Sequence, residues 1–217
     1  RETLARIGTL CQKHHVIVIS DEIHCDLTEP GKSYIPFASV SEACRNNSIT
    51  CIAPTKAFNM AGMQTAAVSV PNPVLRHKVW RGLNTDEIAE PNAFAVPAAV
   101  AAFTKGGAWL DALRAYVQQS KERVVQFVAQ ELPQLSVVPS EATYLLWLDC
   151  GKLGGDGAEI AQVIRRETGL YLSDGDQYGG NGNQFLRMNL ACPHSVVEDG
   201  LRRLKAGILA YQAQKNV

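Results

Sequence analysis

The chain has 217 residues, of which 46% are hydrophobic and 19% are charged, so it suits one large folded domain or two small ones and is not a disordered tail. Its 21 Lys and Arg residues balance its 21 Asp and Glu residues. No net charge therefore favours nucleic acid or an anionic membrane as a partner.

The cysteines and the apolar stretches are the sequence features that indicate a cellular compartment. Six cysteines are scattered without a CxxC pair, which indicates reduced thiols in a cytoplasmic protein and not a disulfide framework. No apolar stretch approaches the roughly 20 residues of a membrane span. The chain starts without Met, inside an expected helix over residues 1 to 15, and we expect an N-terminal part upstream of it.

The first half alternates strands and helices. Residues 16 to 20 are rich in β-branched side chains, which predicts a strand buried on both faces of a parallel sheet. A loop with Pro and Gly follows. The next expected elements are a short helix near 38 to 45, strands at 48 to 53 and 65 to 70, and helices at 74 to 83 and 93 to 104. The last helix is rich in Ala, and we expect it to be buried.

Gly106 and Gly107 mark a change in the pattern. Beyond them the sequence predicts a long amphipathic helix over 108 to 132, ended by Pro133, then strands at 135 to 139, 143 to 150, 170 to 175 and 184 to 192, and a helix at 157 to 168. Ser195 and Glu198 have the spacing of a capping box for a closing helix. We expect two domains, 1–105 and 106–217, the second a compact α+β unit.

Two charged residues follow the expected strands of the first half. Asp21 follows the first strand and Lys56 follows the second, within the segment APTKAFNMAG. Ligands of open α/β sheets lie outside the carboxyl ends of the strands. Lys56 stands among small and apolar neighbours, so we expect it to be partly desolvated, and such a lysine can attack a carbonyl group. The alternative for a lysine taken alone is a turn residue that extends to water. The pair suits pyridoxal phosphate, which needs a lysine to hold it and an acid beside its ring nitrogen.

The segments VIVISDEIHCDL and APTKAFNMAG, in this order, resemble the fold-type I pyridoxal-phosphate enzymes. The resemblance is to the MalY/PatB-like branch of cystathionine β-lyases, within the class I and II aminotransferase superfamily. It continues through ATYLLWLD and FLRMNLACP and covers only the C-terminal part of the family's length. It implies an α/β fold in which part of the large, mostly parallel cofactor-binding domain precedes a small α+β domain.

The resemblance also implies roles for single residues. Lys56 matches the Schiff-base lysine and the base that removes the Cα proton, and Asp21 matches the partner of the pyridine nitrogen. His24 stands where typical aminotransferases have a tyrosine that faces the ring hydroxyl, which favours the lyase branch. Arg187 matches the arginine that binds the substrate α-carboxylate through two hydrogen bonds; the alternative is a strand arginine in a surface salt bridge.

Two departures concern phosphate binding. Many aminotransferases have a serine three residues before the lysine and an arginine eight residues after it, where this chain has Ala53 and Gln64. Thr55 is the remaining candidate for a hydroxyl there.

A metal site at Asp21, His24 and Asp26 lacks a second histidine at a suitable spacing, and we expect no metal. Strand alternation places Glu22 on the opposite side from Asp21, in a structural role.

Three functions remain open. The first is a pyridoxal-phosphate C–S β-lyase that cleaves a small sulfur-containing amino acid to a thiol, pyruvate and ammonia. The second is an aminotransferase on the same fold. The third is a truncated domain that folds or self-associates without catalysis. The resemblance further implies a homodimer that binds neither nucleic acid nor membrane.

Overall fold

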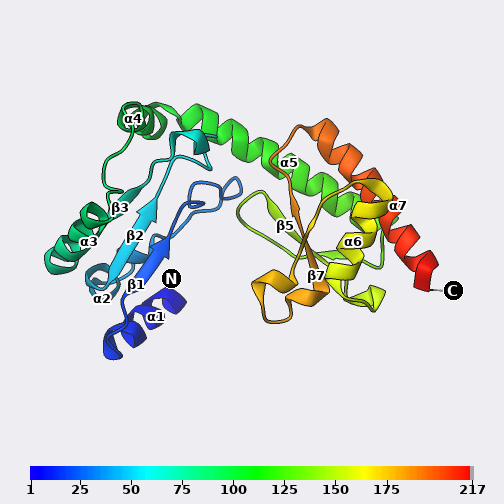
Figure 1. Ribbon diagram of the computed structural model, residues 1–217, viewed down its shortest axis with the longest axis horizontal. Helices are drawn as coiled ribbons and strands as arrows, with labels where there is room; N and C mark the ends of the chain where they lie inside the picture. The colour runs from blue at the N-terminus through cyan, green and yellow to red at the C-terminus, as the bar shows by residue number, and fades with distance from the viewer. Residues whose placement is uncertain (216–217) are drawn as a thin grey trace. The chain divides into compact units, whose positions relative to one another are not determined.

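The computed structural model describes residues 1 to 215 and divides into two compact units (Figure 1). The first spans Arg1–Leu113, and the second begins at Arg114. The division falls within the long helix α5 (Gly107–Glu131), eight residues beyond the boundary expected from the sequence. Each unit has a sheet of its own.

The first unit is built from three short strands and a set of helices. Asn72 caps α3, because its side chain accepts hydrogen bonds from the N–H groups of Val74 and Leu75, and Pro73 occupies the first helical position. The elements are α1 (Glu2–Lys13), β1 (Val18–Asp21), η1 (Phe37–Ser39), α2 (Glu42–Asn46), β2 (Ser48–Ile52), η2 (Ala61–Met63), β3 (Ala67–Ser69), α3 (Pro73–Thr85) and α4 (Ala95–Lys105).

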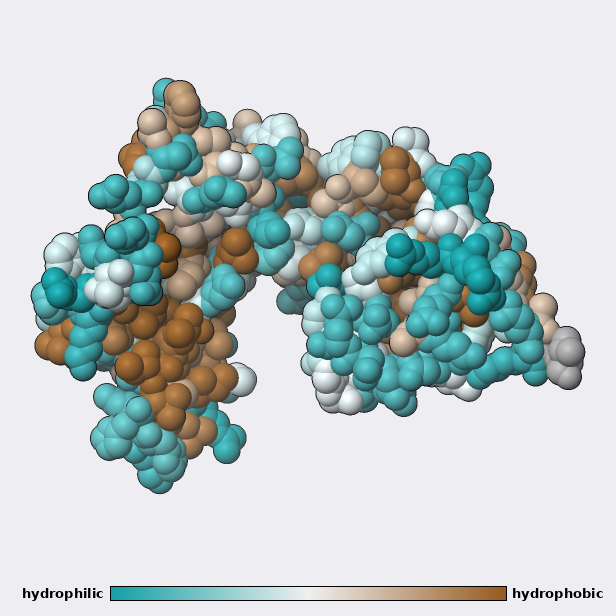
Figure 2. Space-filling view, in the orientation of Figure 1, coloured by the Kyte–Doolittle hydropathy of each residue, from teal (hydrophilic) through white to brown (hydrophobic). Residues whose placement is uncertain are grey.

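The sheet of the first unit has the order β1-β2-β3. β1 and β2 are parallel, with Asp21 opposite Cys51, and β2 and β3 are antiparallel. One face of this sheet is exposed, since the side chains of Ile19 and Val68 are 69% and 39% exposed. Figure 2 shows a hydrophobic surface over this unit, in the region of β1 and α1.

Two expectations for the first unit are wrong in this structure. β1 is an edge strand whose residues alternate between half-buried and exposed, so it is not buried on both faces. Helix α4 exposes Val96, Val100 and Phe103, and only Ala95 and Ala102 are buried along it. In both elements the apolar residue types predict burial. Among residues 1 to 215, however, no atoms cover the exposed faces of β1 and α4.

The second unit is an antiparallel sheet of order β4-β5-β7-β6 packed against helices. Asp156 caps α6 by accepting from the N–H of Ala158, and Gly169 ends it in the left-handed conformation. Besides the C-terminal part of α5, the elements are β4 (Ser136–Val137), β5 (Leu145–Asp149), η3 (Gly151–Leu153), α6 (Gly157–Thr168), β6 (Ser173–Asp174), η4 (Asp176–Tyr178), η5 (Gly182–Gln184), β7 (Phe185–Asn189) and α7 (His194–Lys215).

A hydrophobic core lies in this second unit. Alternate residues of β5 and β7 are buried and belong to it, together with side chains of α5, α6 and α7. The capping box expected at Ser195 is wrong: α7 begins one residue earlier, and the Glu198 carboxylate binds the Arg123 guanidinium of α5 instead. Among residues 1 to 215, no helix has both the length and the apolar character needed to span a bilayer.

Candidate functional site in the first unit

The end of β1 separates two acidic side chains. Asp21 is exposed, on the face of the sheet that carries Ile19, whereas Glu22 is only 4% exposed. The Glu22 carboxylate accepts hydrogen bonds from the Ser20 hydroxyl at 2.9 Å and from the Phe37 N–H at 3.0 Å. Glu22 therefore anchors the segment before η1, in the structural role that strand alternation predicts. Asp21 is exposed, and its Oδ1 accepts a hydrogen bond from the Ile23 N–H at 3.2 Å.

Lys56 lies in a turn just after β2, and its neighbours hold that turn in place. Ala53 and Ala57 are buried, and the indole N–H of Trp109 donates to the Ala57 carbonyl at 3.1 Å. The Phe58 ring packs edge-on against Phe103, with ring centroids 5.9 Å apart. Lys56 itself is exposed, so the expectation of partial desolvation is wrong for residues 1 to 215. A fixed backbone thus presents a solvent-accessible amine.

The turn after Lys56 reverses sharply. Asn59 and Gln64 both adopt a left-handed backbone, with φ of 52° and 47°. Asparagine tolerates this region better than most residues, because its short polar side chain can bond locally. The motif K-A-F-N thus has a local structural reason for its last residue, apart from any role in chemistry.

The pKa of His24 responds to burial and to the charges of both Lys56 and Asp21. Burial lowers the pKa of the His24 imidazole, the Lys56 cation lowers it further, and the Asp21 carboxylate opposes both by raising it. Asp21 ends β1, His24 follows it by three residues, and Lys56 follows β2, so the three residues lie beyond the end of the sheet at which the parallel strands β1 and β2 both terminate. The structure thus brings together three of the residues singled out from the sequence.

Other groups around these three have structural explanations. Burial, with Asp26 and Glu22 nearby, raises the pKa of the Cys25 thiol to about 11, so this cysteine is a protonated, inert thiol at neutral pH. The Thr55 hydroxyl makes no hydrogen bond to the residues that the structure describes, and it is half-buried. The metal alternative gains no support, because residues 1 to 215 contain no group of three His, Cys, Asp or Glu side chains that could hold an ion.

Tyr34 is a neighbour of this site that the sequence analysis did not single out. Burial raises the pKa of its phenol, and the carboxylates of Glu22 and Asp21 add to the rise, while a hydrogen bond with Ser20 opposes it. Trp109 was missed in the same way. Neither residue lies in the two motifs. The available signal was an aromatic side chain, for Tyr34 in a Pro- and Gly-containing loop and for Trp109 two residues after a glycine pair.

Arg187 belongs to the second unit, where β7 positions it. Its strand neighbours Leu186 and Met188 are buried in the core, so its side chain lies on the other face of the sheet. No carboxylate among residues 1 to 215 forms an ion pair with it, which removes the alternative of a surface salt bridge within the described part of the chain. Its guanidinium carbon instead lies 4.8 Å from the centre of the Tyr178 ring.

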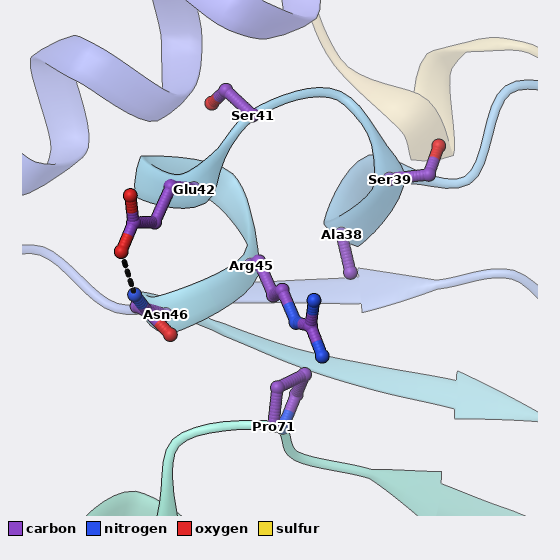
Figure 3. A pocket seen from close by; sticks show the side chains of 7 residues that line it. All are labelled: Ala38, Ser39, Ser41, Glu42, Arg45, Asn46 and Pro71. Carbon is purple, nitrogen blue, oxygen red and sulfur yellow. Dashed lines mark hydrogen bonds between the residues drawn. The ribbon is translucent and has the colours of Figure 1, made fainter.

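Two hollows of the first unit lie outside the three-residue group. One, of about 550 Å³, is lined by residues near α2 and by Pro71; Figure 3 shows Arg45 extending toward Pro71 and Glu42 bonded to Asn46. The other, of about 890 Å³, is lined by β2, the segment 64 to 67 and apolar side chains of α4. Neither includes Asp21, His24 or Lys56 among its lining residues, so neither changes the site.

Comparison with known proteins bears on the fold and the family of this chain. The model of the family described as aminotransferase class I and II matches residues 1–204. Cystathionine β-lyase PatB of Bacillus subtilis (strain 168) is 40% identical over 96% of this chain. Cystalysin of Treponema denticola superposes with a TM-score of 0.91 at 28% identity, over 96% of this chain and 53% of that one. A C–S lyase of Staphylococcus hominis gives a TM-score of 0.83 at 31% identity, over 96% of this chain and 54% of that one.

These matches cover only part of the relatives' length, and they identify the family of this chain. The chain spans about half the length of the curated relatives it matches, 54% in the case of PatB. The family model nevertheless covers most of the chain, from its first residue into α7. The fold, the order of the motifs and the family model agree, and the chain belongs to the aminotransferase class I and II family.

Proposed function

We propose that this chain is part of a pyridoxal-phosphate-dependent C–S β-lyase that cleaves a small sulfur-containing amino acid, such as cystathionine, to a thiol, pyruvate and ammonia. The observation that carries the proposal is the grouping of an amine, a carboxylate and an imidazole, those of Lys56, Asp21 and His24, where two parallel strands end. The similarity to a cystathionine β-lyase and to a C–S lyase supports the choice of reaction.

The residues present fit the cofactor. Lys56 and Asp21 are exposed, and no ion pair joins them to each other or to another residue among 1 to 215. Lys56 would hold the group covalently through Nζ, and the Asp21 carboxylate would keep a proton on its ring nitrogen. Once bound, pyridoxal phosphate supplies an electron sink for the negative charge that develops at the substrate Cα. His24 and the Thr55 hydroxyl are the further candidates for polar contacts to it.

The chain's own groups then divide the remaining tasks. The free amine of Lys56 would take the Cα proton, and His24, whose lowered pKa keeps it neutral near pH 7, adds no second cation beside it. The Arg187 guanidinium would bind the substrate α-carboxylate, since its donors match both carboxylate oxygens. From the resemblance and the free cysteines we infer a cytoplasmic homodimer.

The first experiment tests the cofactor. The gene product that carries this chain is mixed with pyridoxal phosphate, reduced with borohydride and digested for peptide mass analysis. We expect the reduced adduct on Lys56, its loss in Lys56→Gln, and no loss in Lys78→Gln, which changes an exposed lysine of α3. Absence of an adduct on Lys56 in the unmodified protein would contradict the proposal and favour a catalytically incompetent domain.

A second experiment separates lyase from aminotransferase, the alternative that the family as a whole keeps open. We expect release of pyruvate from cystathionine without any added keto acid. Product formation that depends strictly on a keto-acid acceptor would instead identify an aminotransferase. Asp21→Asn is expected to lower kcat by at least about a hundredfold, because an amide cannot stabilise a protonated ring nitrogen by charge.

A further inference from the structure

Arg187 contacts an aromatic side chain and forms no ion pair with a carboxylate among residues 1 to 215. Arg187 pairs across the sheet with Trp147 of β5 on one side and with Ser173 of β6 on the other. The Trp147 ring meets the Tyr178 ring edge-on, with centroids 5.2 Å apart and planes at 83°, and it meets the Phe185 ring in the same manner. Tyr178 therefore contacts both Arg187 and the residue opposite it in the sheet.

The loop that carries Tyr178 is closed by backbone contacts and is not a loose turn. A Cβ on Gly175 would lie 2.2 Å from the Gly182 carbonyl oxygen, and a Cβ on Gly182 would lie 2.0 Å from that of Gly175. Only glycine at both positions lets the two ends of the loop approach this closely. The Gly175 N–H also donates to the Phe185 carbonyl at 2.9 Å, which joins the loop to the first residue of β7.

We propose that Tyr178 is a positioning residue for Arg187, which holds the guanidinium by its ring face so that the hydrogen-bond donors stay free for a substrate carboxylate. An aromatic face attracts the cation without using its N–H groups, whereas a carboxylate partner would occupy them. The proposal rests on the function proposed above, because it assumes that Arg187 binds the α-carboxylate. It also gives a role to the loop that Gly175 and Gly182 close, because this loop carries Tyr178 to Arg187.

Three substitutions in the gene product that carries this chain test the proposal. Tyr178→Leu removes the aromatic face, and Tyr178→Phe keeps it. Tyr171→Leu is the matched control, because Tyr171 is an exposed tyrosine of the same unit that stacks on a different arginine, Arg165, at 5.3 Å. We expect Tyr178→Leu to raise KM for cystathionine about three- to tenfold with little change in kcat, and the other two to leave both nearly unchanged.

Arg187→Lys separates failure of this proposal from failure of the proposed function. If Arg187→Lys raises KM and Tyr178→Leu does not, the positioning role is overturned and the carboxylate role of Arg187 stands. If Arg187→Lys leaves KM unchanged, both roles are overturned. An unfolded Tyr178→Leu variant would be recognised by its circular dichroism. A normal KM in Tyr178→Phe together with a raised KM in Tyr178→Met, which keeps a bulky apolar side chain without a ring, would then support the ring contact, while equal KM values in these two variants would oppose it.

A readout without catalysis covers the case in which the protein releases no pyruvate. The side-chain Nε–H resonance of Arg187 is followed by NMR during titration with acetate, in the unmodified protein and in the same variants. The proposal expects Tyr178→Leu to shift this resonance, because the ring current is lost, and to weaken acetate binding about three- to tenfold. A resonance and an acetate affinity that both stay unchanged in Tyr178→Leu would overturn it.

Discussion

At the scale of single residues, His24 is a group of the site whose pKa the structure lowers. Its pKa is lowered from 6.5, first by burial and then by the Lys56 cation, and Asp21 only partly compensates. In the window between this lowered pKa and 6.5, the unfolded chain binds more protons than the folded chain. The free energy of unfolding therefore falls as the pH falls through that window, and the effect is absent above it.

His24→Gln is expected to flatten this pH dependence. Glutamine keeps a polar group of similar size but does not titrate, so the variant no longer loses stability through protonation of this site. Urea unfolding of the chain at a series of pH values between about 5 and 8 measures the difference. Parallel curves for the variant and the unmodified chain would mean that other groups cause the acid sensitivity.

At the scale of elements, the packing of α6 against α7 depends on Gly207. A Cβ at Gly207 would lie 2.8 Å from Cγ1 and 3.0 Å from Cα of Ile164, so Gly207→Ala must push the two helices apart. We expect it to lower the free energy of unfolding by about 1–3 kcal/mol, as overpacking of a core does. Gly200→Ala in the same helix is the control.

The control position Gly200 differs from Gly207 in the space around an added Cβ atom. A Cβ at Gly200 would meet its nearest atom, the Met188 methyl carbon, at 3.5 Å, which is ordinary van der Waals contact. Alanine favours the helix over glycine, so Gly200→Ala is expected to be neutral or to stabilise the chain by about 0.5–1 kcal/mol. Thermal and urea unfolding of both variants give the comparison, and equal losses at the two positions would disprove the packing argument.

The helices and strands show how much of the fold could be predicted from the sequence. Helix α6 has the limits that the sequence predicts, and the structure gives a local reason for both ends: a capping aspartate precedes the helix and a left-handed glycine ends it. The burial of β1 and α4 was not predicted correctly, because burial depends on which atoms cover a face and not on the residues within it. For the same reason the exposure of Lys56 differed from expectation, although its place beyond β2 was predicted.

The sequence predicted those residues of the candidate site that come directly after strands. Asp21 and Lys56 come directly from the order of the strands, and the parallel pairing of β1 with β2 brings them to one edge. Tyr178 could not be found in this way. Its contact with Arg187 depends on two glycines, seven positions apart, whose backbones touch only after the loop has folded.

At the scale of the whole molecule, the two units differ in how completely they bury apolar side chains. The hydrophobic core cluster runs from Val124 to Tyr211 and lies within the second unit. In the first unit the exposed face of the sheet carries Ile19, and Phe94 is 73% exposed. Since burial of apolar surface is the main source of stability, the second unit should be the more stable of the two.

Hydrogen exchange of the isolated chain tests this difference. We expect the amides of β5 and β7 to exchange at least about tenfold more slowly than those of β1 and β2, which corresponds to about 1.4 kcal/mol of opening free energy. Leu204→Ala, at a fully buried position of α7, should cost about 2–5 kcal/mol and lower protection in β5 and β7 alone. Leu209→Ala, at a position 52% exposed in the same helix, should change little. Equal protection of both sheets, lowered together by Leu204→Ala, would show that the two units unfold as one.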